Sequence, residues 1–167
     1  MRLYHTGFKE ITKPDLYIGR KNADFGQGFY LSPDFSFSSR WASSFKDKNT
    51  IVNIYELDCS CLNIKEFKLD EEWLKYISNN RNFKEAYLKE YDVIIGPISN
   101  DTIYNLYGVI TSGYLTSSQS LRILKIGDEY TQVVLKSLKA IDNLKFISSN
   151  IISSQDIESN YRAYYFN

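Results

Sequence analysis

Alternation of apolar and polar positions predicts the strands of this chain. Over residues 50–57 both alternating sets contain apolar side chains, which is typical of a strand at the centre of a sheet. Residues 91–97 form an apolar run that ends at Gly96-Pro97 and predict a second buried strand. Shorter runs predict further strands at residues 1–6, 27–32, 131–135 and 145–152.

Apolar residues at helical spacing predict amphipathic helices between these strands. Residues 34–46 begin at a helix-start signal and place Phe37, Trp41 and Phe45 on one side. Residues 70–79 open with acidic side chains, which the helix dipole favours, and predict a surface helix that packs on the core. Further helical segments are expected at 101–112, 118–126 and, as a helix or a turn, 137–144.

The order of these elements favours one α+β domain over residues 1–167. Strands and helices do not alternate regularly, which argues against a parallel α/β sheet. A chain of 167 residues can bury one ordinary core. The long polar connection from Lys9 to Gln27 stands out, because loops of this length in small domains are usually functional.

Composition excludes several classes of function. Twenty basic and twenty acidic residues cancel, so no general field attracts nucleic acid or an anionic membrane. No apolar run has the length of a signal peptide or a membrane span, so the cytoplasm is the expected compartment. Cys59 and Cys61, two apart on a predicted strand, are expected to be reduced structural thiols. With a single histidine, no metal site is expected.

A glycine-flanked turn is the strongest candidate for chemistry. Residues 24–30 read Asp-Phe-Gly-Gln-Gly-Phe-Tyr, and Ser38 and Trp41 follow on the predicted helix. With His5 on the first strand, they indicate a slot with two aromatic walls for a flat ring, as in a nicotinamide-binding cleft. Each part also has a structural interpretation: a simple hairpin turn, a structural histidine, or a core stripe of aromatic residues. The Asp-Phe-Gly sequence does not indicate a kinase, because the other kinase motifs are missing.

In order and spacing, these residues resemble the catalytic domain of diphtheria-toxin-like and poly(ADP-ribose)-polymerase-like ADP-ribosyltransferases. More closely, the chain resembles a family of small bacterial proteins of unknown function, family 3990. The resemblance implies an ADP-ribosyltransferase-like split β-sandwich with flanking helices and a central NAD cleft. The features that carry it are His5, Asp24 to Tyr30, Ser38, Trp41-Ala42, the strand 50–57, Tyr91 to Pro97, Asn100-Asp101 and Gln132.

The resemblance also implies roles for individual residues. His5 would bond the adenosine ribose, Tyr30 and Trp41 would sandwich nicotinamide, and the backbone of Thr6 would hold the carboxamide. The hydroxyl of Ser38, with Ser39 as a rival, would bond the same amide, and Gln132 would meet the nicotinamide ribose. Gly28 belongs to the same NAD-binding set. In the long loop, Arg20 is expected to contact pyrophosphate, with Tyr17, Lys21 and Asn22 as weaker candidates.

Two positions depart from the pattern of these enzymes. Thr6 stands where a glycine usually follows the histidine, and Gln132 stands where a glutamate usually opens the late strand. An amide orients a hydroxyl but cannot ionise, so chain elongation to poly(ADP-ribose) is not expected. Glu129 lies three residues away and is a poor substitute. Asn100 and Asp101 are either a helix cap or the acceptor side of the cleft.

The expected function is therefore NAD-dependent mono-ADP-ribosylation of a macromolecule, with NAD as co-substrate and release of nicotinamide. By family analogy the protein is a toxin-like or regulatory enzyme, for which an antitoxin is an expected partner. The acceptor, protein or nucleic acid, stays open. Two alternatives are an NAD-binding pseudoenzyme, because of Gln132, and an interaction module whose cleft is vestigial, because of the many tyrosines.

Overall fold

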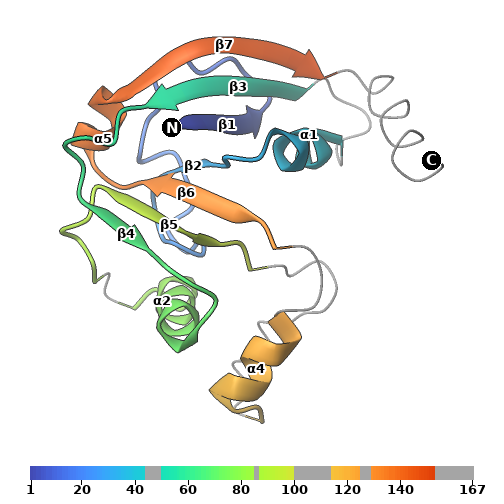
Figure 1. Cartoon of the computed structure of the whole chain (residues 1–167), viewed down its shortest axis with the longest axis vertical. Helices are drawn as coiled ribbons and strands as arrows, with labels where there is room; N and C mark the ends of the chain where they lie inside the picture. Colours follow the sequence, from blue (N-terminus) through green and yellow to red (C-terminus); the bar gives the residue numbers. More distant parts are fainter. Residues whose placement is uncertain (44–49, 85–86, 100–113, 125–128, 153–167) are drawn as a thin grey trace.

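The computed structural model describes residues 1–43, 50–84, 87–99, 114–124 and 129–152 (Figure 1). The predicted helix at 101–112, Asn100, Asp101 and the tyrosine-rich end of the chain lie outside the described residues. The described part is a mixed α+β structure with two sheets. This confirms the coarse fold class expected from the order of elements.

The first sheet is antiparallel and has the order β1-β3-β7. Its strands are β1 (Arg2–Gly7), β3 (Thr50–Leu57) and β7 (Leu144–Ile152). The central place of β3 confirms the prediction from its two apolar faces. Helix α1 (Phe35–Ser43) packs on this sheet, where the ring of Phe35 meets that of Tyr4 edge-on at 5.3 Å.

The second sheet has the order β2-β6-β5-β4. Its strands are β2 (Phe29–Leu31), β6 (Thr131–Leu135), β5 (Val93–Pro97) and β4 (Ile64–Glu66). Only the β4–β5 pair is parallel. The sequence pattern did not predict β4, because three residues are too few to show alternation.

Side chains of the second sheet alternate between two cores. Val93, Val133 and Leu135 face the first sheet and pack there with Leu3 and Tyr55. On the other face, the core lies under α2 (Glu71–Arg81) and α4 (Ser117–Leu124), which Figure 1 shows on the side away from the first sheet. The short helix α5 (Leu138–Asp142) joins β6 to β7. The residues of this second core are Phe25, Phe67, Trp73, Tyr76, Ile77, Ile94, Leu124 and Val134.

Most predicted elements occur within a few residues of their expected bounds, and one local prediction was wrong. Cys59 and Cys61 are free thiols, as expected, but they lie in the turn that follows β3 and not on a strand. Strand β3 ends at Leu57, and the side chain of Asp58 accepts from the N–H of Ser60, which stabilises a turn in place of continued pairing.

Candidate functional site

A short backbone bridge next to His5 joins the two sheets. Tyr4 and Ser32 exchange two backbone hydrogen bonds of 2.8 and 2.9 Å, which continues β1 onto the end of β2. One residue further along β1, Nδ1 of His5 lies 2.8 Å from the carbonyl oxygen of Tyr30. The histidine therefore ties the strands together at the junction of the sheets.

Two cavities lie beside this junction and share wall residues. We call the first the arginine cavity, of about 400 Å³; its walls include Arg20, Arg81, Asp24, Phe37, Ile98 and Ser99. We call the second the loop cavity, of about 540 Å³; it lies beneath the long loop, and Ile11, Ile18, Gly28 and Phe29 line it. His5 and Tyr30 line both cavities.

Most of the predicted NAD-binding residues fall in these walls. The arginine cavity brings together His5, Thr6, Arg20, Tyr30, Ser38 and Gln132. Gly28 lines the loop cavity. The backbone of Trp41 belongs to α1, but its side chain lies outside the described part of the structure. Tyr17, Lys21 and Asn22 are exposed in the loop and line neither cavity.

The hydrogen bond of His5 fixes its tautomer. Because a carbonyl oxygen only accepts, Nδ1 carries the proton and Nε2 is left as an acceptor in the neutral ring. Burial lowers the pKa of His5, opposed in part by its bond to Tyr30, so the ring is neutral near pH 7. Phe29 stacks on it with ring centroids 4.6 Å apart. The result is a fixed neutral acceptor in the wall of both cavities.

The hydroxyl of Tyr30 is fully engaged by the glycine turn. It donates to the carbonyl of Gly26 at 2.6 Å and accepts from the N–H of Phe25 at 3.0 Å. Burial is the main cause that raises its pKa far above the ordinary value. A hydroxyl held in this way does not serve as an acid or base at neutral pH, so the ring is what Tyr30 offers to a ligand.

Gln132 is oriented by the end of the neighbouring strand. Its Nε2 donates to the carbonyl oxygen of Pro97 at 3.3 Å, which leaves Oε1 as the acceptor that is available to a ligand. Trp73 donates to the same carbonyl at 3.0 Å. Gln132 lies two residues before Val134 on β6, and Tyr30 is paired with Val134, so all three side chains are on one face of the sheet. Val134 belongs to the second core, so this is the face toward that core.

Thr6 and Ser38 join β1 to α1 beside the cavity. The hydroxyl of Thr6 donates to the carbonyl oxygen of Ser38 at 2.8 Å, which ties the strand to the helix. Of the two rival serines, Ser38 lines the arginine cavity. Ser39 does not line it, and its buried hydroxyl has no hydrogen-bond partner among the residues that the structure describes.

The sequence analysis missed the basic residue at the end of α2. Nε and a terminal nitrogen of Arg81 lie 2.8 and 2.6 Å from one oxygen of Asp24, at the rim of the arginine cavity. The sequence around Arg81 is an ordinary polar helix end, so nothing in it indicates a functional role. Its partner Asp24, in contrast, belongs to the glycine-turn motif. Arg20 is different, because no described side chain forms an ion pair with it.

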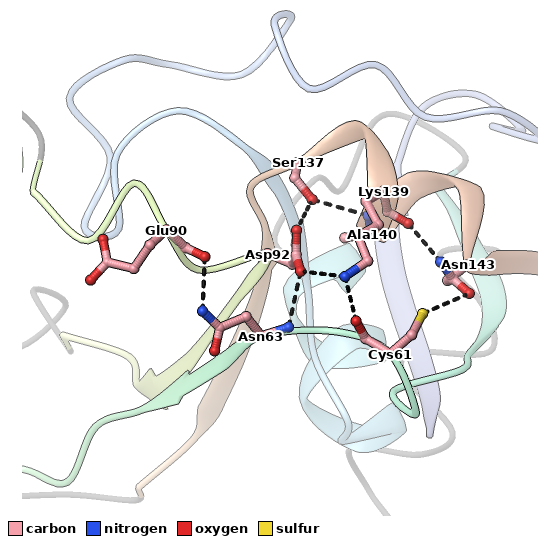
Figure 2. Close-up of polar contacts among 8 residues, drawn as sticks. All are labelled: Cys61, Asn63, Glu90, Asp92, Ser137, Lys139, Ala140 and Asn143. Carbon is pink, nitrogen blue, oxygen red and sulfur yellow. Dashed lines mark hydrogen bonds and ion pairs between the residues drawn. The ribbon is translucent and has the colours of Figure 1, made fainter.

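Tyr91 and Asp92 lie at the other end of β5, away from the cavities. Figure 2 shows that Asp92 accepts from Ser137, Lys139 and the N–H of Asn63. The bond from Asn63 contributes most to lowering the pKa of Asp92. This network joins the ends of β4, β5 and α5, so Asp92 has a structural role at this strand end. Glu129 is exposed and precedes β6.

The described residues show neither a metal site nor a membrane-spanning helix. No three of their histidine, cysteine and acidic side chains lie close enough to hold a metal ion. None of their helices has the length and apolar character that crossing a bilayer requires.

Comparison with known proteins gives a family and no further relative. Neither a curated protein nor a solved structure matches the chain. The family model described as "Protein of unknown function (DUF3990)" matches residues 1–146, which is most of the chain. The chain therefore belongs to this family.

Proposed function

We propose that the protein is an NAD-dependent mono-ADP-ribosyltransferase with an ADP-ribosyltransferase-like split sandwich. The observation that carries this proposal is the pair of cavities that share His5 and Tyr30 as wall residues. A ligand with two ring systems joined by a linker suits two adjoining cavities better than a mononucleotide does. Each cavity has a volume in the range of about 300–1,000 Å³ that is common for small-molecule sites.

The groups in the cavity walls fit the parts of NAD. The ring of Tyr30, held by its hydroxyl, offers a flat face for nicotinamide. Arg20 offers a guanidinium for the pyrophosphate. Nε2 of His5 and Oε1 of Gln132 are acceptors of the kind that ribose hydroxyls require.

The residues of the chain would act by orientation and not by acid–base chemistry. NAD supplies a glycosidic bond whose cleavage releases nicotinamide. His5 and Gln132 would fix the sugars, and Ser38 with the backbone of Thr6 would hold the carboxamide. Gln132 brings no charge to the site, which supports transfer of a single ADP-ribose to an acceptor that is itself activated. By family analogy, the proposal includes a cytoplasmic toxin-like or regulatory role, with an antitoxin as a partner.

The test measures NAD binding and transfer separately. Calorimetry with millimolar NAD should give binding, and a tagged NAD analogue should label one macromolecule in a cell extract. Arg20→Gln should weaken binding, whereas the neighbouring exposed Lys21→Gln, which lines neither cavity, is the matched control. Absence of binding by the unmodified protein would contradict the proposal.

The amide of Gln132 favours a second candidate, an NAD-binding protein without transfer activity. In that case NAD raises the melting temperature by ligand linkage but nicotinamide is not released. Labelling by the tagged analogue that is lost in Tyr30→Ala and kept in Tyr17→Ala would rule this candidate out. Tyr17 is a suitable control because its side chain is exposed and outside both cavities.

A further inference from the structure

The carbonyl oxygens of the glycine turn are held by side chains from other elements. Asn80 donates to the carbonyl of Asp24 at 2.9 Å. Nζ of Lys136 donates to the carbonyls of Phe25 and Gln27 at 2.5 and 2.6 Å. The Tyr30 hydroxyl donates to the carbonyl between them, that of Gly26. All consecutive carbonyls from residue 24 to residue 27 are thus bonded by side chains.

This arrangement is unusual for a turn, because loop carbonyls normally face water. Gly26 has a φ of 71°, in the left-handed region that favours glycine, so the turn has a shape that other residues rarely adopt. Side chains from α2, from β2 and from the residue after β6 converge on it. The turn is therefore fixed by the tertiary structure and not by its own backbone bonds alone.

Lys136 makes two of the four bonds to these carbonyls. It contacts the carbonyls on both sides of Gly26, and no carboxylate among the described residues pairs with it. Burial lowers the pKa of Lys136 to about 8. Even a half-buried cation without an acidic partner loses hydration, and the carbonyls of the turn replace the water that it gives up.

We propose that Lys136 is a positioning residue that clamps the turn 24–27 and thereby sets the orientation of the Tyr30 ring in the cleft. The Tyr30 hydroxyl is bonded to the N–H of Phe25 and to the carbonyl of Gly26, and Lys136 holds the carbonyls on either side of that of Gly26. Lys136 lines neither cavity, so it acts on a ligand only through the turn. This proposal depends on the proposed function only in taking NAD as the ligand.

The experiment compares Lys136→Met with Lys139→Met. The first keeps the aliphatic chain and removes the donor, whereas the second removes an exposed ammonium that bonds the carboxylate of Asp92 and does not touch the turn. The readout is the NMR signal of the Tyr30 ring, identified with Tyr30→Phe, together with hydrogen exchange of the Phe25 amide. We expect Lys136→Met to shift the ring signal and to accelerate exchange at least tenfold, and Lys139→Met to change neither.

A second variant keeps the test decisive if Lys136→Met does not fold. Asn80→Ala removes the bond to the Asp24 carbonyl and leaves the lysine in place, so it should shift the same ring signal by a smaller amount. Unchanged Tyr30 signals in a folded Lys136→Met variant would overturn the clamp, as would unchanged signals in Asn80→Ala if Lys136→Met is unfolded.

The NAD affinity of the same variants separates this proposal from the proposed function. If the unmodified protein binds NAD, we expect Lys136→Met to bind it about tenfold more weakly, with Lys139→Met unchanged. If the unmodified protein does not bind NAD, the proposed function fails, but the NMR comparison still decides whether Lys136 positions the Tyr30 ring.

Discussion

Replacement of Gln132 by glutamate tests whether this site is built for an amide. Gln132 is only 6 % exposed and donates to the carbonyl of Pro97, which also accepts from Trp73. Gln132→Glu keeps the size of the side chain and replaces the donor by an oxygen. An ionised carboxyl would then face a carbonyl oxygen in a buried place, whereas a protonated one would still donate to Pro97.

The loss in free energy of unfolding that we expect for Gln132→Glu follows from burial of the carboxyl and from the lost hydrogen bond. Desolvation and the facing carbonyl both favour the neutral form, and a rise of about two units in the pKa of the introduced carboxyl is a conservative expectation for a buried site. At about 1.4 kcal/mol per unit, the folded state then loses about 3 kcal/mol of stability at pH 8. The lost hydrogen bond adds about 1 kcal/mol.

The sign of the pH dependence is fixed by the direction of that shift. An acid with a raised pKa in the folded state is not penalised below its unfolded pKa of about 4.3, where it is protonated in both states. The penalty grows as the pH rises through the folded pKa. Gln132→Glu should therefore be nearly as stable as the unmodified protein at pH 4 and clearly less stable at pH 8.

The assay is urea unfolding at both pH values, with Gln132→Met as the uncharged control. Gln132→Met loses the same donor but should show no added pH dependence, so the difference between the two variants isolates the carboxyl. Equal free energies of unfolding for Gln132→Glu at pH 8 and for the unmodified protein would refute the reasoning. The introduced carboxyl is expected to be substantially protonated near pH 6. At that pH we therefore expect Gln132→Glu to release nicotinamide no faster than the unmodified protein does.

Three further predictions concern the stability of the junction. Gly28→Ala should lower the free energy of unfolding, measured in urea, by about 1–3 kcal/mol, because a Cβ at Gly28 would lie 2.6 Å from the carbonyl oxygen of Leu135. Gly7→Ala is the control and should lower it much less, because the nearest atom to a Cβ there is 3.5 Å away. Tyr30→Phe should lose about 1–3 kcal/mol, because the backbone groups that its hydroxyl bonds lose their partner; an unchanged unfolding midpoint would contradict this. The lowered pKa of His5 means that the folded state resists protonation, so the free energy of unfolding should fall as the pH drops below about 6.5, and His5→Gln should remove that part of the slope.

Particular residues show how far sequence reasoning reaches at the site. Order and spacing led to His5, Tyr30 and Gln132, and the structure places all three at the walls of one cavity. Arg81 and Lys136 escaped prediction, because each lies far along the chain from the turn it contacts and neither belongs to a recognisable pattern. Contacts of this kind depend on how α2 and β6 pack, which local periodicity does not encode.

The sequence by itself determined most of the longer elements, because burial of one face imposes a period on each strand and helix. The α+β class and the centre of the first sheet follow from that local pattern. The tertiary structure alone decided the single bridge between Tyr4 and Ser32, the two cavities beside it and the donors that hold the glycine turn. These features arise where segments distant in the chain meet, and their geometry depends on all the partners at once.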